Sequence, residues 1–350
     1  MSAPFPHDVG IAIVCHNNRE KLAATLASLQ AAGCESSRIL VADALSSDGT
    51  AEWLRETHPG VRVHALDRND GPNPGRNLGI RETPHPYVFL MDADVQVLPD
   101  TIVKLRAAMA AEPAVKIGSP IVVHADAPET IQYAGGHLHF ICEAINPWMN
   151  RPLAQRGTAR EDVGIASANG LLIEREAAIG IGLFDERYFM GKDDGDFTHR
   201  MRLAGHRILE LPDALVLHRS RPRSDWLFYY QVRNRWHFML KNYQWRTLVA
   251  LLPCLVVHET LQMAMLHAAG HGRTYWRALR GLVAMLPALP HDRAQIRRLR
   301  RVSDATLLKS DRLIVRDDLV RHPLARWGKG AYEAALTAYW WLLRHTVFAR

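Results

Sequence analysis

Several features that would place this chain in a familiar class are missing from it. The four cysteines, at positions 15, 34, 142 and 254, include no Cys-x-x-Cys pair. This argues against a zinc site or a disulfide framework and favours a reducing compartment. Residues 1–14 lack a basic region and a cleavage site, so no secretory signal is expected. Internal repeats and low-complexity tracts are also missing. These absences favour a globular protein of the cytoplasm.

Two common nucleotide-binding motifs are absent as well. No G-x-G-x-x-G follows the first apolar run, and no G-x-x-x-x-G-K-[ST] occurs anywhere in the chain. A dinucleotide-dependent dehydrogenase and a P-loop NTPase are therefore disfavoured.

The bulk composition fits a globular protein with an anionic partner. The 350 residues are 48% hydrophobic and 23% charged, enough for one large domain or two smaller ones. The net charge of +7 suits a nucleotide, a nucleic acid or an acidic lipid surface, without choosing among them.

The most informative stretch runs from Tyr87 to Asp94. Five apolar residues lead directly into Asp92 and Asp94, which are two positions apart. A short apolar run predicts a strand buried on both faces, and open α/β sheets bind ligands beyond the carboxyl ends of such strands. Two adjacent carboxylates repel each other, and a divalent cation such as Mg²⁺ relieves that repulsion. A polar turn without a ligand is the alternative explanation.

Strands and helices are predicted to alternate before this stretch. Strands are expected over 9–14, 39–42 and 61–65, with helices beginning near Arg19, Ala51 and Arg76. This alternation predicts a parallel sheet with right-handed crossovers. Polar residues close several of these strands, among them His16, Asn17 and Asp43, so the carboxyl edge of the sheet is the expected site.

A second acidic block lies much later in the chain. Asp193, Asp194 and Asp196 precede a helical pattern and are expected at a helix N-terminus, where the macrodipole stabilises negative charge. A first-turn acid cluster without catalytic function has the same appearance.

Taken in order, these motifs resemble those of family 2 glycosyltransferases of the GT-A fold, in the rhamnosyltransferase-like branch. The resemblance spans roughly residues 9–240 and rests on these segments: Ile13 to Asn17, Val41 to Asp43, Ser47 to Thr50, Gly71, Gly75 to Gly79, Leu90 to Asp94, and Asp193 to Asp196. It implies an α/β mixed sheet, Rossmann-like and flanked by helices.

The resemblance also implies roles for individual residues. The base or ribose of a nucleotide-sugar would contact Asp43, while Asp92 and Asp94 would hold Mg²⁺ or Mn²⁺ on the diphosphate. The catalytic base would be Asp194, with Asp193 in place of the usual Glu, and a single base implies inversion of configuration. The predicted donor-binding residues are His16, Asn17, Arg19, Asp43, Asp70, Gly71, Arg76, Asn77, Asp92 and Arg233.

A strand is predicted over 207–211, and His218 follows a further apolar run after it. In relatives a histidine here joins the metal, and a buried structural histidine is the alternative. Residues 124–163 are predicted to form a hairpin and loop over the acceptor side. Within them His137 and His139 alternate on a possible strand, but no third ligand stands at a suitable spacing. The family pattern after the second strand is altered to Asp43-Ala44-Leu45-Ser46, which leaves the nucleotide base open between dTDP-rhamnose and UDP-sugar donors.

The last third of the chain is helical and apolar in pattern. Seven basic residues and eight aromatic residues are interleaved over 219–246, and residues 247–270 contain one acid, Glu259. Pro253 and Glu259 near the middle of that stretch favour a membrane-apposed helix over a spanning one. A basic cluster over 293–301 and an apolar helix over 331–348 follow.

We therefore predict a catalytic domain over 1–244, with a nucleotide-sugar half at 1–123 and an acceptor half at 124–244. A helical region at 245–350 would lie on the cytoplasmic, inner-leaflet face of a membrane. Packing of these helices on the protein, or between copies in a homo-oligomer, is the alternative.

The expected activity is sugar transfer to a glycan or lipid-linked acceptor in cell-surface polysaccharide or glycolipid assembly. A nucleotidyltransferase would share the sheet and acidic pair, but usually has a Gly-rich loop after the first strand. A basic RNA-binding protein fits the interleaved basic and aromatic residues, yet not the ordered acidic motifs, so no nucleic acid partner is expected.

Overall fold

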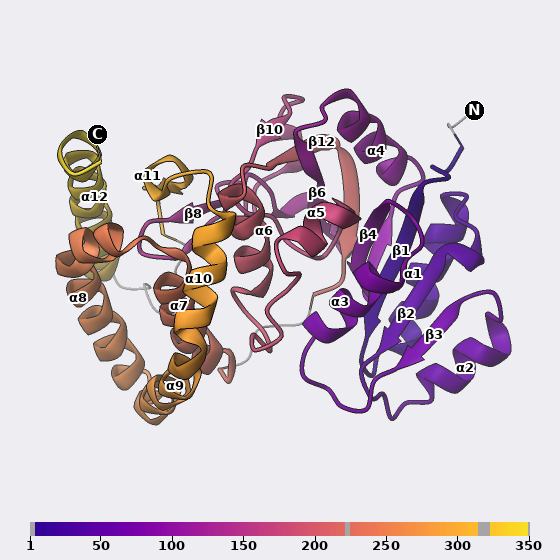
Figure 1. Cartoon of the computed structure of the whole chain (residues 1–350), viewed down its shortest axis with the longest axis horizontal. Coiled ribbons are helices and arrows are strands. Elements are labelled where there is room, and N and C mark those ends of the chain that lie inside the picture. Colours follow the sequence, from indigo (N-terminus) through magenta and orange to yellow (C-terminus); the bar gives the residue numbers. More distant parts are fainter. Residues whose placement is uncertain (1–3, 221–224, 314–322, 349–350) are drawn as a thin grey trace. The chain divides into compact units, whose positions relative to one another are not determined.

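The computed structural model describes residues 4–220, 225–313 and 323–348. They form two compact units, each described here by itself (Figure 1). The first unit comprises residues up to 136 together with 148–202 and 206–222. The second unit comprises 137–147, 203–205 and the chain from 223 onward. Residues 221–224, which belong to the interleaved basic and aromatic stretch, lie outside the described part.

A ten-stranded sheet forms the centre of the first unit, in the order β10-β12-β6-β11-β4-β1-β2-β3, with β5 on β12 and β7 on β6. Its strands are β1 (Val9–Cys15), β2 (Ile39–Asp43), β3 (Arg62–Ala65), β4 (Tyr87–Asp92), β5 (Val95–Val97), β6 (Val115–His124), β7 (Ala127–Tyr133), β10 (Glu161–Asp162), β11 (Leu171–Glu174) and β12 (Arg207–His218). The helices are α1 (Arg19–Ala31), α2 (Thr50–Thr57), α3 (Asn73–Glu82), α4 (Thr101–Ala111), α5 (Arg175–Gly180) and α6 (Asp193–Leu203).

Strand directions decide where the polar strand ends meet. β1 is parallel to both β2 and β4. β11 is antiparallel to both β4 and β6, and β12 is parallel to β6. Therefore β1, β2, β4 and β12 all point the same way, and their carboxyl ends lie at one edge of a mixed sheet.

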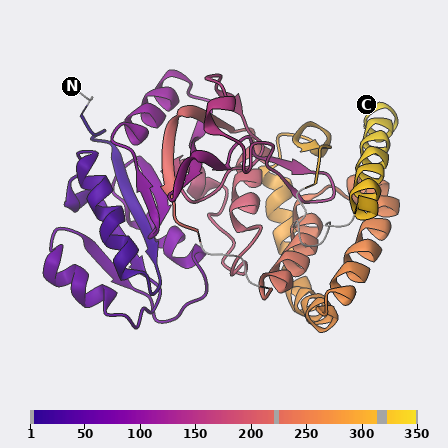
Figure 2. The ribbon, with the colours of Figure 1, turned by 180° about the vertical axis from the view of Figure 1, so that it is seen from behind.

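Helices lie on both faces of this sheet (Figure 1 and, from behind, Figure 2). One face packs Leu22, Leu26 and Leu29 of α1, and also α4, against alternate residues of β1 such as Ile11 and Ile13. These side chains are almost fully buried. The spacing of the three leucines is the helical repeat from which α1 is predicted.

The other face receives α3 at unusually close range. A side chain at Gly79 would meet the Ala12 Cβ at 2.4 Å, and one at Gly75 would meet the Ala42 Cβ at 3.0 Å. Glycines four residues apart share one side of the helix. Their contact with small strand residues holds α3 against β1 and β2, and so places Arg76 beside the carboxyl edge.

Two predicted segments differ in extent from the observed ones. The strand predicted over 207–211 continues through Pro212 to His218, with an irregular register between Leu211 and Leu215. The bulge allows pairing with β6 to resume beyond the proline. The segment 124–163, predicted as a hairpin and loop, contains β7 to β10 and is divided between the two units.

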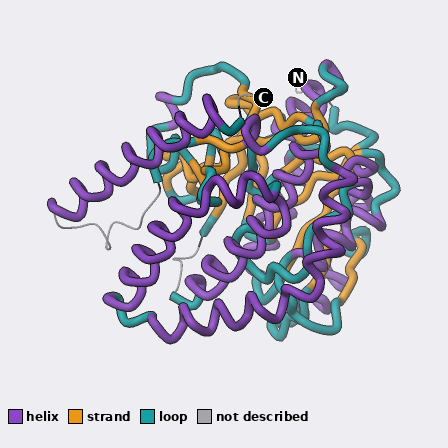
Figure 3. The backbone as a smooth tube through the Cα atoms, turned by 60° about the vertical axis from the view of Figure 1, so that its left-hand side comes forward, coloured by secondary structure: helices purple, strands orange, loops and turns teal. Residues whose placement is uncertain are grey.

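The second unit is mainly helical, as the tube view shows (Figure 3). It contains α7 (Leu227–Asn242), α8 (Trp245–Ala268), α9 (Gly272–Met285), α10 (Leu289–Leu299), α11 (Asp304–Leu307) and α12 (Pro323–Thr346). A three-stranded sheet in the order β13-β8-β9 accompanies them, made of β8 (His137–His139), β9 (Ala144–Ile145) and β13 (Leu308–Lys309). Helices α7, α8 and α9 share a small core that includes Val232, Leu266, Tyr275 and Ala278.

Within the described residues, α8 is the one helix long and apolar enough to cross a membrane. Only 22% of its most apolar window is buried. Such a helix is by itself weak support for a span. The catalytic boundary predicted at residue 244 stays a prediction.

Candidate active site

The carboxyl edge of the sheet gathers the side chains predicted to form the site. Asp92 ends β4, Asp43 ends β2, and His218 ends β12. The pairing of His218 with Val95 of β5 brings it next to Asp94. Three strand ends that are far apart in the sequence thus supply one polar edge.

Asp94 lies between a histidine and a lysine. Its Oδ1 is 3.5 Å from His218 Nε2, and its Oδ2 is 3.2 Å from Lys21 Nζ. Lys21 also donates to the backbone oxygen of Arg219 at 3.0 Å. Burial alone would raise the pKa of Asp94, but His218 and Lys21 outweigh it and hold the pKa below its usual value. Asp94 is therefore an ionised carboxylate at this edge.

The orientation of His218 is set from its far side. Its Nδ1 lies 2.7 Å from Gln132 Oε1 and 3.0 Å from the Asn169 side-chain amide. Gln132 Oε1 can only accept and Asn169 Nδ2 can only donate, so together the two contacts fix the position of the ring and not its tautomer. They aim Nε2 at the Asp94 carboxylate, 3.5 Å away. A histidine oriented from its far side by such contacts matches the usual support of a metal-binding histidine.

Arg76 links the two acidic motifs. Its Nη2 lies 3.1 Å from Asp92 Oδ1, and its Nη1 lies 2.8 Å from Asp193 Oδ2. Only 6% of the Arg76 side chain is exposed. Burial raises the pKa of Asp92, as does Asp94, while Arg76 opposes that rise. The guanidinium thus ties the end of β4 to the first turn of α6.

Asp194 follows directly in α6 and has the environment of a base. Its Oδ1 accepts from the Gly195 backbone N–H at 2.7 Å. Burial and the neighbouring Asp193 charge raise the pKa of Asp194 to about 6, against the opposing charge of Arg76. A carboxylate with a pKa near the working pH is both ionised and basic enough to accept a proton.

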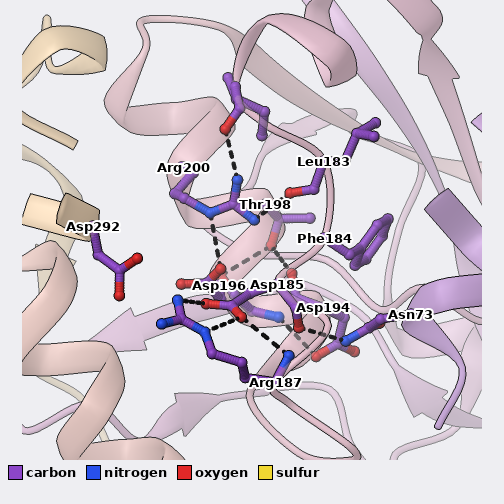
Figure 4. A network of polar contacts seen from close by, with 12 residues as sticks. Asn73, Leu183, Phe184, Asp185, Arg187, Asp194, Asp196, Thr198, Arg200 and Asp292 are labelled. Atoms are coloured by element: carbon purple, nitrogen blue, oxygen red, sulfur yellow. Dashed lines mark hydrogen bonds and ion pairs between the residues drawn. The ribbon is translucent and has the colours of Figure 1, made fainter. Parts of the chain in front are cut away.

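The start of α6 is held by a network of ion pairs (Figure 4). Arg200 donates to Asp196 Oδ2 at 2.8 Å and to the backbone oxygen of Ile181 at 2.8 Å. Arg187 forms a two-point pair with Asp185 on the preceding loop. Asp196, the third acid of the block, is therefore a structural partner of Arg200.

Residues of α3 hold the loop that leads into α6. Asn77 exchanges hydrogen bonds with the Phe184 backbone, at 3.0 and 2.8 Å. The Asn73 side chain donates to the backbone oxygens of Asp185 and Tyr188 at 3.1 and 2.9 Å. Their amides position the acidic helix, and a contact of Asn77 with the donor stays a prediction.

Gly71 is required by the same packing. Its φ is +91°, and a side chain there would meet the Phe189 backbone oxygen at 2.3 Å. Neighbouring Asp70 is half exposed and pairs with Arg68. Their predicted contacts with a donor are not tested by this arrangement.

The loops after β1 and β2 are joined to each other. His16 Nδ1 donates to the Ala44 backbone oxygen at 2.7 Å, and Asn17 Oδ1 accepts from the Ser47 N–H at 2.7 Å. Asp43 is nearly buried and accepts from the Ser46 hydroxyl. The altered Asp43-Ala44-Leu45-Ser46 segment therefore keeps a hydrogen bond on its carboxylate.

Arg19 and Arg233, both predicted to bind the donor, have guanidinium groups packed on aromatic rings. The Arg19 guanidinium lies 5.5 Å from the centre of the Trp53 ring. Arg233 belongs to α7 in the second unit, where its guanidinium lies over Tyr229 and Tyr230 at 5.3 and 5.0 Å. Its contact with a diphosphate stays a prediction.

His139 is also in the second unit. It is buried, and that burial lowers its pKa to about 4. Its Nδ1 accepts from the Ile141 N–H at 3.2 Å.

Sequence reasoning did not single out Lys21, Asn73, Gln132 or Asn169. Lys21 and Gln132 belong to no motif, and only the chain's folding brings them to Asp94 and His218. Asn73 lies in the loop Gly71 to Gly75, where its type suggests a turn and not a buried bridge.

Comparison with known proteins identifies the class. Residues 10–177 match the family described as glycosyl transferase family 2. Solved structures share the fold: GalNAc-T7 with UDP, GalNAc and Mn²⁺ matches with a TM-score of 0.55 at 16% identity, over 69% of this chain and 50% of that chain. TarS of S. aureus in complex with UDP-GlcNAc matches with a TM-score of 0.53 at 14% identity, over 83% and 89%. The chain thus contains a family 2 glycosyltransferase domain and is a transferase, and the predicted GT-A mixed sheet is confirmed.

Sequence relatives define its branch. The chain is 29% identical over 214 residues to the N-acetylglucosaminyl-diphospho-decaprenol L-rhamnosyltransferase of Mycobacterium tuberculosis, covering 55% of this chain and 70% of the relative. It is 30% identical over 96 residues to the succinoglycan biosynthesis protein ExoO of Rhizobium meliloti, covering 27% and 28%. The chain is thus rhamnosyltransferase-like, as its motifs predict.

Proposed function

We propose that this protein is a metal-dependent, inverting glycosyltransferase. It transfers a sugar from a nucleoside-diphosphate donor, of the dTDP-rhamnose or UDP-sugar class, to a hydroxyl of a lipid-linked glycan acceptor. The observation that carries the proposal is the Arg76 bridge, which joins Asp92 at the end of β4 to Asp193 and so keeps Asp194 near the acidic pair.

The side chains at this edge fit a divalent cation. Asp94 Oδ1 and His218 Nε2 offer one oxygen and one nitrogen ligand 3.5 Å apart. Among the residues described, no group of three or more His, Cys, Asp or Glu side chains is arranged for a metal. Two protein ligands completed by diphosphate oxygens suit Mg²⁺ or Mn²⁺, which commonly bind through few carboxylates and substrate phosphates. When bound, the ion neutralises charge that develops on the departing diphosphate.

Asp92 contributes differently from Asp94. Its carboxylate is already engaged by Arg76, with 27% of the side chain still exposed. Arg76 therefore offsets the repulsion between Asp92 and Asp94 and leaves an exposed carboxylate for the ribose or the cation.

Asp194 accepts the proton of the attacking hydroxyl. Its pKa of about 6 lies below neutral pH, so it is ionised there and still basic enough to accept a proton, and the hydrogen bond from Gly195 stabilises the charged form. One base and one direct displacement at the anomeric carbon imply inversion. Asp193 orients Arg76 and keeps the pKa of Asp194 high.

Donor and acceptor classes are supported by the relatives. The mannosyltransferase PcManGT from Pyrobaculum calidifontis, in complex with GDP-Man and Mn²⁺, matches with a TM-score of 0.50 at 16% identity over 99% of this chain and 90% of that chain. The name of the mycobacterial relative specifies a diphospho-decaprenol acceptor. We assign the protein to polysaccharide or glycolipid assembly, peripherally on the cytoplasmic face of a membrane.

The test combines a donor screen with one substitution. Binding of dTDP-rhamnose, UDP-sugars and GDP-sugars is measured by thermal shift, since ligands of the native state raise Tm. Turnover is then followed with Mg²⁺ or Mn²⁺, with and without EDTA, and the anomeric configuration of the product is read by NMR.

Asp194→Asn should lower kcat by about 10²–10⁴-fold while donor binding is retained. Asp213→Asn, which changes an exposed acid on β12, is the matched control and should keep full turnover. Unchanged turnover in Asp194→Asn, or full activity in EDTA, would contradict the proposal.

A further inference from the structure

The second unit carries an apolar stripe along α8 that is open to solvent in the described structure. The stripe consists of the exposed residues Trp245, Val249, Leu252, Val256, Val257 and Leu261. Trp245, Val249, Leu252 and Val256 recur at spacings of three and four residues and share one side of the helix, and Val257 and Leu261 continue the apolar surface around it. Val249 alone is 70% exposed. A contiguous apolar surface of this kind marks an interaction site.

The remaining side of α8 is fixed to the protein, with Glu259 at its border with the stripe. Glu259 accepts from the buried Arg235 guanidinium, from Trp236 Nε1 at 2.8 Å and from the Tyr275 hydroxyl at 2.7 Å. Leu251 and Leu255 are buried on that same side. These contacts set the rotation of α8 about its axis, so the stripe points away from the unit.

Neighbouring helices of this unit also carry exposed tryptophans. Helix α12 is tied to α8 by the Tyr339 hydroxyl, which donates to the Ala250 backbone oxygen at 2.6 Å. Besides Trp245, the exposed tryptophans of the unit include Trp276 on α9 and Trp327 and Trp341 on α12. Indole rings, apolar with one polar N–H, are enriched where a membrane meets water.

Charge on these helices is strongly one-sided. Residues 245–301 contain nine arginines and two acids, Glu259 and Asp292. The side chains of those acids are only 17% and 9% exposed. Arg246, Arg277 and Arg298 are all exposed. The surface of α8 to α10 therefore presents positive charge without compensating acids, which matches an anionic headgroup layer.

We propose that the second unit binds anionic lipid bilayers through the α8 stripe, with α8 lying in the plane of the interface. The inference deepens the proposed function, on which it rests for its biological meaning, because a lipid-linked acceptor is presented at such a surface. A peripheral helix with apolar and basic sides and tryptophan anchors is the usual form of interfacial binding.

Two other arrangements fit the structure less well. Helix α8 has 24 residues, about 36 Å at 1.5 Å per residue, which is long enough to span. Spanning would pull Glu259 into hydrocarbon and leave the buried Arg235 without this partner, both costly changes. A homodimer through the stripe would bring the arginines of two copies together.

Vesicle flotation of the full chain tests the surface. The protein should float with vesicles of phosphatidylglycerol and phosphatidylcholine, and bind less at high salt or on pure phosphatidylcholine. Replacing Val249 and Val256 together by Gln should weaken binding about tenfold or more. Ile179→Gln, an exposed position of α5 in the first unit, is the matched control. Equal binding by the stripe variant, or a lipid-free dimer that this variant dissociates, would overturn the proposal.

Thiol labelling separates the in-plane from the spanning arrangement. The four native cysteines are buried and free, so Arg246→Cys and Ala268→Cys each supply one exposed thiol at opposite ends of α8. With protein added to preformed vesicles, an impermeant reagent outside should label both positions. Protection of one end alone would show a span and overturn the in-plane arrangement.

Neither readout depends on turnover. Vesicle binding without sugar transfer would refute the proposed function and leave the membrane surface standing. Sugar transfer without vesicle binding would refute the membrane surface and leave the proposed function standing.

Discussion

Each unit contains a buried arginine that contacts two carboxylates, and the two arginines have different surroundings. Arg76 in the first unit pairs with Asp92 and Asp193 at the edge of the sheet. Arg235 in the second unit is fully buried, pairs with Glu259 and lies 3.8 Å from Glu143. Glu259 also accepts from Trp236 and Tyr275.

The two sites differ in whether the carboxylates paired with the arginine can still bind a ligand. Asp92 keeps part of its surface exposed and can contact a ligand, and the pKa of Asp194 beside this pair is raised to about 6, which suits a proton acceptor. Glu259 is surrounded by protein donors and anchors α8. A buried arginine paired with carboxylates thus orders a candidate site in the first unit and fixes helix α8 in the second.

Replacing each arginine by Met should separate these roles, and the largest effect on stability is expected at Arg235. Arg235→Met leaves a mostly buried carboxylate without its cation and should destabilise by about 3–5 kcal/mol. Arg76→Met should also cost stability, because it leaves Asp193, which is only 10% exposed, without its cation, and it should in addition reduce turnover severely. Denaturant unfolding and steady-state kinetics on the folded fraction measure both. Equal stability losses with equal turnover would show that the two arginines do not differ.

Gln132→Leu tests the support of His218. Without the amide oxygen, the ring loses a partner that orients it, and metal affinity should fall by about 10–100-fold. Titration of Mn²⁺ in the presence of nucleoside diphosphate measures it. Vesicle binding by the second unit should be unaffected. Unchanged metal affinity would argue against His218 as a ligand.

The pH profile of turnover should show the smallest shift. The base form of Asp194 is lost as pH falls through its raised pKa, so kcat should drop below about pH 6, by about tenfold per unit. Asp193→Asn removes a neighbouring negative charge that raises this pKa, so the acid limb should move to lower pH. A limb that moves upward, or not at all, would contradict the assigned cause.

Sequence patterns predicted the elements that build the site. The apolar run ending in Asp92 became β4, the leucine repeat became α1, and the acid cluster became the first turn of α6. Each depends on local periodicity, which the chain carries within a few residues.

Contacts between distant segments were not predictable in this way. The pairing of Arg76 with both Asp92 and Asp193 requires α3, β4 and α6 to be placed first. The extension of β12 past Pro212 depends on its neighbour β6, not on local preference. The division of residues 137–147 from their surroundings likewise follows from partners near the end of the chain.

That division has a practical consequence for anyone shortening the gene. Leu138 of β8 pairs with Leu308, and Phe140 stacks on Trp340 at 5.0 Å between ring centres. A protein ending near residue 222 would keep this hairpin but would lose β13 and α12, which pack on it. The C-terminal third therefore cannot be removed without effect on the rest of the protein. Its removal would expose the apolar side chains of residues 137–147 and favour aggregation.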